Sequence, residues 1–169
     1  MTTFAAKLAQ ERPEEIAIRD EDKAMGWAEV DEMLNQVANG LLGLDLGPDH
    51  RIAVFAENAI ETAMANLGGL LAGASVVPVN FHLTADEVAY ILQDSGARVL
   101  FVDVATAERG VEAASQSEVN SVVGWGGSSG ENLIPWDAWL AASTPGEPPS
   151  DMPPRPNLLY TSGTTGRPK

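Results

Sequence analysis

The chain has 169 residues, enough for one α/β domain with a short tail, and 44% of them are hydrophobic, as a packed core requires. The absence of cysteine excludes a disulfide framework, a thiolate zinc site and a cysteine nucleophile. The 24 acidic and 10 basic residues give a net charge of −14, which repels phosphate backbones and anionic lipid head groups, so nucleic acid and membrane surfaces are not expected as partners.

Neither a targeting signal nor a membrane span is predicted. Residues 1–13 carry charges at Lys7, Glu11 and Arg12 and have no uninterrupted apolar core, unlike a signal peptide. Residues 62–85 are uncharged, but glycines, asparagines and a proline interrupt them well before the roughly 18 apolar residues that a span needs. We therefore expect a cytoplasmic protein.

The first predicted elements alternate between helix and strand. Apolar residues at three- and four-residue spacing predict an amphipathic helix over Trp27–Leu42, which Gly43 ends. The run Ile52–Phe55 predicts a buried strand. Asn58 is expected to cap the next helix. That helix, with Gly73 at its end, would turn one face inward, made of Ile60, Met64, Leu67 and Leu71.

The alternation continues through the middle of the chain. Val76–Val79 is the next predicted strand, followed by a helix that opens on a capping box of Thr84 and Glu87 and stops at Gly96. Further elements follow: a strand over Val99–Val102, a weaker helix over 105–114 and a strand over Ser121–Gly124. Strands and helices in this order predict an α/β fold with a largely parallel sheet flanked by helices.

The composition changes after this unit. A short helix over 135–142 would carry Trp136 and Trp139, which are expected in the core or at a domain contact. Residues 143–156 contain six of the eleven prolines and are predicted to form an extended connector. We therefore divide the chain into an α/β subdomain (1–142), this connector (143–156), and a strand over Asn157–Tyr160 with a phosphate-binding loop (157–169).

Residues 160–169 form the candidate binding motif of the chain. They read Tyr-Thr-Ser-Gly-Thr-Thr-Gly-Arg-Pro-Lys. Glycines let successive backbone N–H groups face one anion, hydroxyls add donors and can bind Mg²⁺, and the lysine supplies positive charge. The common nucleotide loop would need glycine where Pro168 stands. The pattern indicates a polyphosphate site of another class, and its plain alternative is a Ser/Thr/Gly surface loop.

The full string resembles the signature loop of the adenylate-forming superfamily, which includes acyl-CoA synthetases, luciferases and peptide-synthetase adenylation domains. That signature reads Tyr-Thr-Ser-Gly-Thr-Thr-Gly-x-Pro-Lys, and residues 160–169 match every fixed position. Residues 25–30, 49–54 and 73–80 follow the upstream pattern of the family more loosely. Within the superfamily, the chain is most similar to long- or medium-chain fatty-acid-CoA ligases.

The resemblance implies a two-step reaction that uses ATP, Mg²⁺ and coenzyme A. A carboxylate, expected to be a fatty acid, attacks the α-phosphate of ATP to give acyl-AMP, and the thiol of coenzyme A then displaces AMP. Thr161 would be the magnesium ligand. The residues that would hold the β- and γ-phosphates are Thr161, Ser162, Gly163, Thr164, Thr165, Gly166 and Lys169.

The family's adenine and ribose motifs, its acidic magnesium ligand and its adenylation lysine do not occur up to Lys169, so no catalytic residue is expected in this chain. The α-carboxylate of Lys169, with a pKa near ~3.5, would offset the charge of its own ammonium group. We therefore expect a truncated piece of a longer enzyme that by itself binds ATP weakly and is inactive.

Alternative interpretations stay open. The acyl acceptor could be a carrier-protein thiol, as for an acyl-AMP ligase or a peptide-synthetase adenylation domain, and the chain could instead be a non-catalytic interaction module. The small residues of 63–73 favour close helix packing, within the chain or across a homodimer. Asp20, Glu21 and Asp22 are interpreted as a solvated turn, and His50 and His82 as surface residues.

Overall fold

A computed structural model describes residues 4–128 and 130–161. The helices in these ranges are α1 (Phe4–Glu11), α2 (Trp27–Leu42), α3 (Ile60–Leu71), α4 (Ala85–Ser95), α5 (Ala107–Ser115) and α6 (Trp136–Ala141). The strands are β1 (Ile16–Arg19), β2 (Ala24–Gly26), β3 (Arg51–Phe55), β4 (Ser75–Pro78), β5 (Val99–Val102), β6 (Ser121–Gly124) and β7 (Ile134–Pro135).

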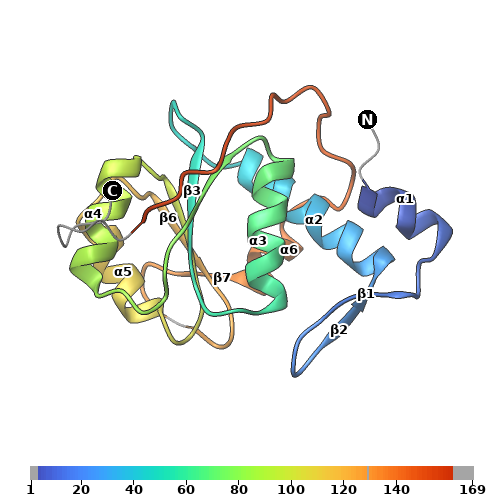
Figure 1. Ribbon diagram of the computed structural model, residues 1–169, viewed down its shortest axis with the longest axis horizontal. Helices are drawn as coiled ribbons and strands as arrows, with labels where there is room; N and C mark the ends of the chain where they lie inside the picture. Colours follow the sequence, from blue (N-terminus) through green and yellow to red (C-terminus); the bar gives the residue numbers. More distant parts are fainter. Residues whose placement is uncertain (1–3, 129, 162–169) are drawn as a thin grey trace.

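Five strands form one parallel sheet in the order β4-β3-β5-β6-β7. The chain moves from β3 to β4 on one side, then returns past β3 to β5, and helices cover both faces (Figure 1). With right-handed crossovers, the step from β3 to β4 places α3 on one face, and the steps in the opposite direction place α4 and α5 on the other, which makes the sheet doubly wound. The predicted α/β fold with a parallel, helix-flanked sheet is confirmed.

Each face of the sheet has its own apolar core. Val54 and Phe101 pack with α2, α3 and α6, whereas Phe55, Leu100 and Val102 pack with α4 and α5. Successive strand residues point to opposite faces, so a strand that is covered on both sides reads as a continuous apolar run. Trp136 and Trp139 lie in the first core around Phe101, as predicted, and Trp125 joins them there.

Two glycines let α3 approach its neighbours closely. A Cβ atom on Gly68 would lie 2.4 Å from Cγ1 of Val37 in α2, and one on Gly69 would lie 2.4 Å from Cδ1 of Ile52 in β3. The close helix packing expected from the small residues is therefore satisfied within the chain. One part of the expected inward face is wrong, because the Leu67 side chain lies away from the sheet and is 48% exposed.

The helix signals near α4 are confirmed in detail. The Thr84 hydroxyl accepts a hydrogen bond from the Glu87 amide, and the Glu87 carboxylate accepts one from the Thr84 amide at 2.9 Å. Gly96 ends the helix in the left-handed conformation with φ 67°. The bounds of α2 are those predicted, and none of the helices in the described ranges is long and apolar enough to cross a membrane.

An N-terminal hairpin, which was not predicted from the sequence, caps the start of α3. β1 and β2 pair antiparallel, separately from the main sheet. In the turn between them, the Asp20 carboxylate accepts hydrogen bonds from the amides of Lys23 at 2.8 Å and Ile60 at 3.2 Å. Lys23 also forms an ion pair with Glu61. The prediction that Asn58 caps α3 is wrong, and the acidic turn is more than a solvated one.

Candidate functional site

The segment that leads to the hydroxyl-rich loop runs along the outer edge of β4. The Leu158 amide donates to the Val76 carbonyl at 3.0 Å, and the Ser75 hydroxyl donates to the Pro156 carbonyl at 2.7 Å. The Arg155 guanidinium donates to the Gly73 carbonyl at 2.7 Å. Residue numbers rise together on both sides, so the segment runs parallel to β4.

Asn157–Tyr160 was predicted as a strand, and the structure assigns none there. One backbone hydrogen bond joins the segment to β4, while Ser75 and Arg155 make the other contacts through side chains. Pro78 of β4 faces the segment and has no N–H group to donate to the Leu158 carbonyl, so the ladder does not continue past the Leu158–Val76 bond. The prediction is therefore wrong as a strand, although the segment lies where an additional parallel strand would lie.

Tyr160 fixes the end of this segment. Its hydroxyl donates to Oδ2 of Asp94, near the end of α4, at 2.6 Å. Its ring and the Leu158 side chain pack against the core that α4 and α5 share, whereas Leu159 points the other way and is 65% exposed. Burial and the neighbouring Asp94 carboxylate raise the pKa of Tyr160 above its usual value, which already lies well above neutral pH, and the hydroxyl is therefore a donor.

Of the predicted phosphate-binding residues, Thr161 is described, and its side chain is exposed. The others lie outside the described residues: Ser162, Gly163, Thr164, Thr165, Gly166 and Lys169. The exposed hydroxyl of Thr161 suits Mg²⁺, which usually takes one or two protein oxygens and completes its shell with water and substrate phosphates. Within residues 4–128 and 130–161, no group of three or more His, Asp or Glu side chains could hold a metal ion.

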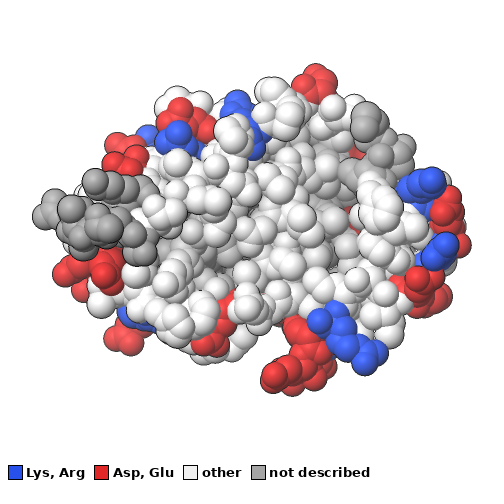
Figure 2. Space-filling view, in the orientation of Figure 1, with Lys and Arg blue, Asp and Glu red and all other residues white. Residues whose placement is uncertain are grey.

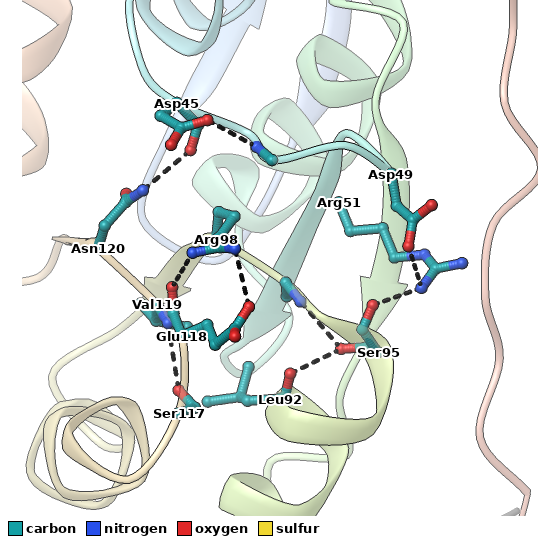
Figure 3. Close-up of polar contacts among 12 residues, drawn as sticks. Asp45, Asp49, Arg51, Leu92, Ser95, Arg98, Ser117, Glu118, Val119 and Asn120 are labelled. Carbon is teal, nitrogen blue, oxygen red and sulfur yellow. Dashed lines mark hydrogen bonds and ion pairs between the residues drawn. The ribbon is translucent and has the colours of Figure 1, made fainter.

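A polar cluster surrounds the amino ends of the strands beside this segment (Figure 3). The Arg51 guanidinium donates to the Ser95 carbonyl and pairs with Asp49 at 3.2 Å. Arg51, Ser75 and Arg155 line a hollow of about 270 Å³ between the β4 edge and the segment. On the other side of the cluster, Arg98 pairs with Glu118 at 2.8 Å. These pairs hold the strand ends in place and include none of the predicted site residues.

The carboxyl edge between β3 and β5 is closed by a buried network. Doubly wound sheets often bind ligands at this position, where the strand order reverses. Here Asp103, 7% exposed, accepts hydrogen bonds from the amides of Glu57 at 2.8 Å and Thr106 at 2.9 Å. Asp103 was not among the residues predicted to have a role, although the Asp-x-x-Thr spacing after a strand is a signal for such a turn. The Asp103 carboxylate stabilises the turns that follow β3 and β5.

Comparison with known proteins decides the family. The family model described as "AMP-binding enzyme" matches residues 5–169, almost the whole chain. The chain belongs to the AMP-binding enzyme family. This confirms the adenylate-forming resemblance and makes the chain part of a family of ligases.

Two curated relatives show the range of the AMP-binding family. Tyrocidine synthase 2 of Brevibacillus parabrevis is 34% identical over 163 residues, which cover 96% of this chain and 4% of the relative. Fatty acid–[acyl-carrier-protein] ligase ScoC of Streptomyces coeruleorubidus is 34% identical over 166 residues, which cover 95% of this chain and 30% of the relative. The chain thus spans less than a third of the length of either protein.

Solved structures of the family share the fold. The anthranilate CoA ligase AuaEII in complex with anthranoyl-AMP superimposes with a TM-score of 0.83 at 25% identity, over 97% of this chain and 33% of that one. MbtA of Mycobacterium smegmatis gives 0.82 at 29% identity, over 98% of this chain and 32% of that one. Nearly the whole of this chain therefore matches about a third of each of these proteins.

Proposed function

We propose that this chain is part of an ATP-dependent acyl-CoA ligase. The enzyme activates a carboxylate, with a fatty acid as the first candidate, and transfers the acyl group to coenzyme A. One observation carries the proposal: the match to the AMP-binding family extends through residue 169 and so includes the hydroxyl-rich loop with Lys169. The loop supplies donors and one cation for the pyrophosphate end of ATP.

In this proposal the loop stabilises a leaving group. When the carboxylate attacks the α-phosphate, negative charge develops on the departing pyrophosphate, and donors already aimed at it lower the barrier. Bound Mg²⁺ would neutralise part of the same charge, with the Thr161 hydroxyl as its protein ligand. The residues proposed to hold the β- and γ-phosphates are Thr161, Ser162, Gly163, Thr164, Thr165, Gly166 and Lys169.

A second candidate differs in the acyl acceptor, which would be a carrier-protein thiol in place of coenzyme A. The support for it is that ScoC is a fatty acid–[acyl-carrier-protein] ligase and is 34% identical to this chain. In this case the first half-reaction and the loop's role are the same. The two candidates therefore separate only in the second half-reaction.

Pyrophosphate exchange into ATP tests the first half-reaction. The complete enzyme that carries this chain is incubated with ATP, Mg²⁺ and a panel of straight-chain and aromatic carboxylates. We expect carboxylate-dependent exchange, lowered at least about 100-fold by Lys169→Ala or by alanine at Thr164 and Thr165 together. Ser150→Ala, an exposed hydroxyl in the connector, is the control and should leave exchange unchanged. Normal exchange in the loop variants would contradict the proposal.

The second half-reaction distinguishes the acceptors. The preformed acyl-AMP is offered coenzyme A or a phosphopantetheinylated carrier protein, and the thioester product is identified by mass spectrometry. Acyl-CoA supports the first candidate, and acylated carrier protein alone supports the second. The 169-residue chain by itself is expected to give no exchange, and measurable exchange from it would contradict that expectation.

A further inference from the structure

The entry to the loop is held by four contacts, which we call the tether. They join Arg155 to Gly73, Pro156 to Ser75, Leu158 to Val76 and Tyr160 to Asp94. The first three attach the segment to β4 or to the turn before it. The fourth is made by the residue directly before Thr161, so it is the last of these attachments before the loop begins.

The Tyr160–Asp94 bond joins residues 66 positions apart in the chain. A phenol that donates to a carboxylate makes a charge-assisted hydrogen bond, which is stronger and shorter than a neutral one. The length of 2.6 Å fits this class. The half-buried ring packs against the core beneath α4 and α5, which restricts the directions in which the hydroxyl can point.

Helix α4 is a rigid support for the acceptor. It is fixed at its start by the Thr84–Glu87 capping box and at its end by the left-handed Gly96, two residues after Asp94. Its inner side is buried in the core, as Val88, Ile91 and Leu92 show. The carboxylate is therefore held on a fixed element, whereas the described residues 157–161, which include its partner Tyr160, make one backbone hydrogen bond to the sheet.

We propose that Asp94 is a positioning residue for the phosphate-binding loop, acting through the hydroxyl of Tyr160. The inference rests on the proposed function for its consequence in ATP binding. The bond fixes the position of Tyr160, and so the place at which the chain enters the residues proposed to hold phosphate, beginning with Thr161. Loss of the bond weakens ATP binding and leaves the chemistry of the bound state intact.

The first experiment tests the tether in this chain by hydrogen exchange of the Leu158 amide. Tyr160→Phe removes the hydroxyl and keeps the ring, so the packing survives. We expect exchange to accelerate about three- to tenfold in Tyr160→Phe and in Asp94→Ala, and less in Asp94→Asn, which retains an acceptor oxygen. Ser150→Ala removes an exposed hydroxyl from the connector and should have no effect. Equal hydrogen exchange of the Leu158 amide in all variants would show that the Tyr160–Asp94 bond does not hold this segment in place.

The second experiment tests the consequence in the complete enzyme. Tyr160→Phe and Asp94→Ala are each expected to raise the KM for ATP about three- to tenfold in pyrophosphate exchange, with kcat within about twofold. Because both act through one bond, the double variant should be no worse than either single one. Asp94→Asn, which keeps an acceptor oxygen, should raise the KM for ATP less than Asp94→Ala does, and Ser150→Ala should match the unsubstituted enzyme.

The outcomes separate the two claims. An active enzyme whose KM for ATP is unchanged in these variants, or whose losses add, would overturn the positioning role alone. Absence of pyrophosphate exchange in the unsubstituted enzyme would overturn the proposed function and, with it, the role of Asp94 in ATP binding. Hydrogen exchange at Leu158 would in that case still decide whether the tether exists.

Discussion

Gly96 shows how one residue ends an element. It has φ 67° and ψ 26°, and its amide donates to the Leu92 carbonyl at 3.0 Å. An added Cβ would have no atom within 4 Å, so space does not exclude a side chain here. The requirement for glycine is conformational, because residues with a Cβ disfavour the left-handed region.

We therefore expect Gly96→Ala to lower the free energy of unfolding by about 1–2 kcal/mol, and Gly96→Asn to lower it less. Urea denaturation followed by circular dichroism measures both. Gly43→Ala is the matched control, since Gly43 ends α2 with φ −80° and its nearest neighbour would lie 3.4 Å from the new Cβ. A cost at Gly43 equal to that at Gly96 would contradict the explanation.

At the scale of elements, the β1–β2 hairpin and α3 are joined by Asp20. The amides of Lys23 and then Ile60 hold the pKa of this carboxyl below its usual value. A carboxyl with a lowered folded-state pKa stabilises the fold above its unfolded pKa of about 3.9, and the stabilisation is lost as pH falls through the folded-state pKa.

Asp20→Ala should lower the melting temperature at pH 7, and the difference from the unsubstituted chain should shrink as the pH is taken from 5 to about 2. Thermal melts across this range measure the effect. Asp22→Ala is the control. Asp22 lies in the same turn and contacts Asp20 through its backbone amide, which the substitution keeps. A difference that stays constant down to pH 2 would show that the carboxylate charge is not the cause.

At the scale of the whole molecule, the charges are unevenly placed. The face that carries α3 and the C-terminal segment is mostly uncharged, and Lys, Arg, Asp and Glu gather around its rim (Figure 2). With a net charge of −14, like charges repel one another in the folded state. The alternative of a homodimer contact and the division of the chain at residues 142 and 156 stay predictions.

Raising NaCl from 0.01 to 0.15 M should therefore stabilise the chain, because the Debye length falls from about 30 to about 8 Å. We expect the melting temperature to rise by about 2–4 °C, equivalent to about 1 kcal/mol for a chain of this size. KCl should act like NaCl if screening is the cause. A melting temperature that is unchanged, or that falls, would contradict self-repulsion as a destabilising factor.

The sequence by itself determined the features with local causes. The apolar periodicity of Trp27–Leu42, the Thr84–Glu87 box and Gly96 each depend on neighbours within a few residues, so their interpretation needed no partner. The loop at residues 160–169 was likewise recognised from residue types and spacing, and the family match includes it. Its phosphate-binding role stays a proposal.

Tertiary structure alone decided the contacts between distant residues. Asp20 accepts a hydrogen bond from the start of a helix 40 positions later in the chain, and Tyr160 donates one to Asp94, 66 positions earlier. Leu158 donates to Val76 at the edge of the sheet. Each depends on which edges and turns meet once the sheet is assembled, and a polar residue in a turn carries no mark of its future partner. For this reason the sequence identified the loop, and only the fold located its entry beside β4 and α4.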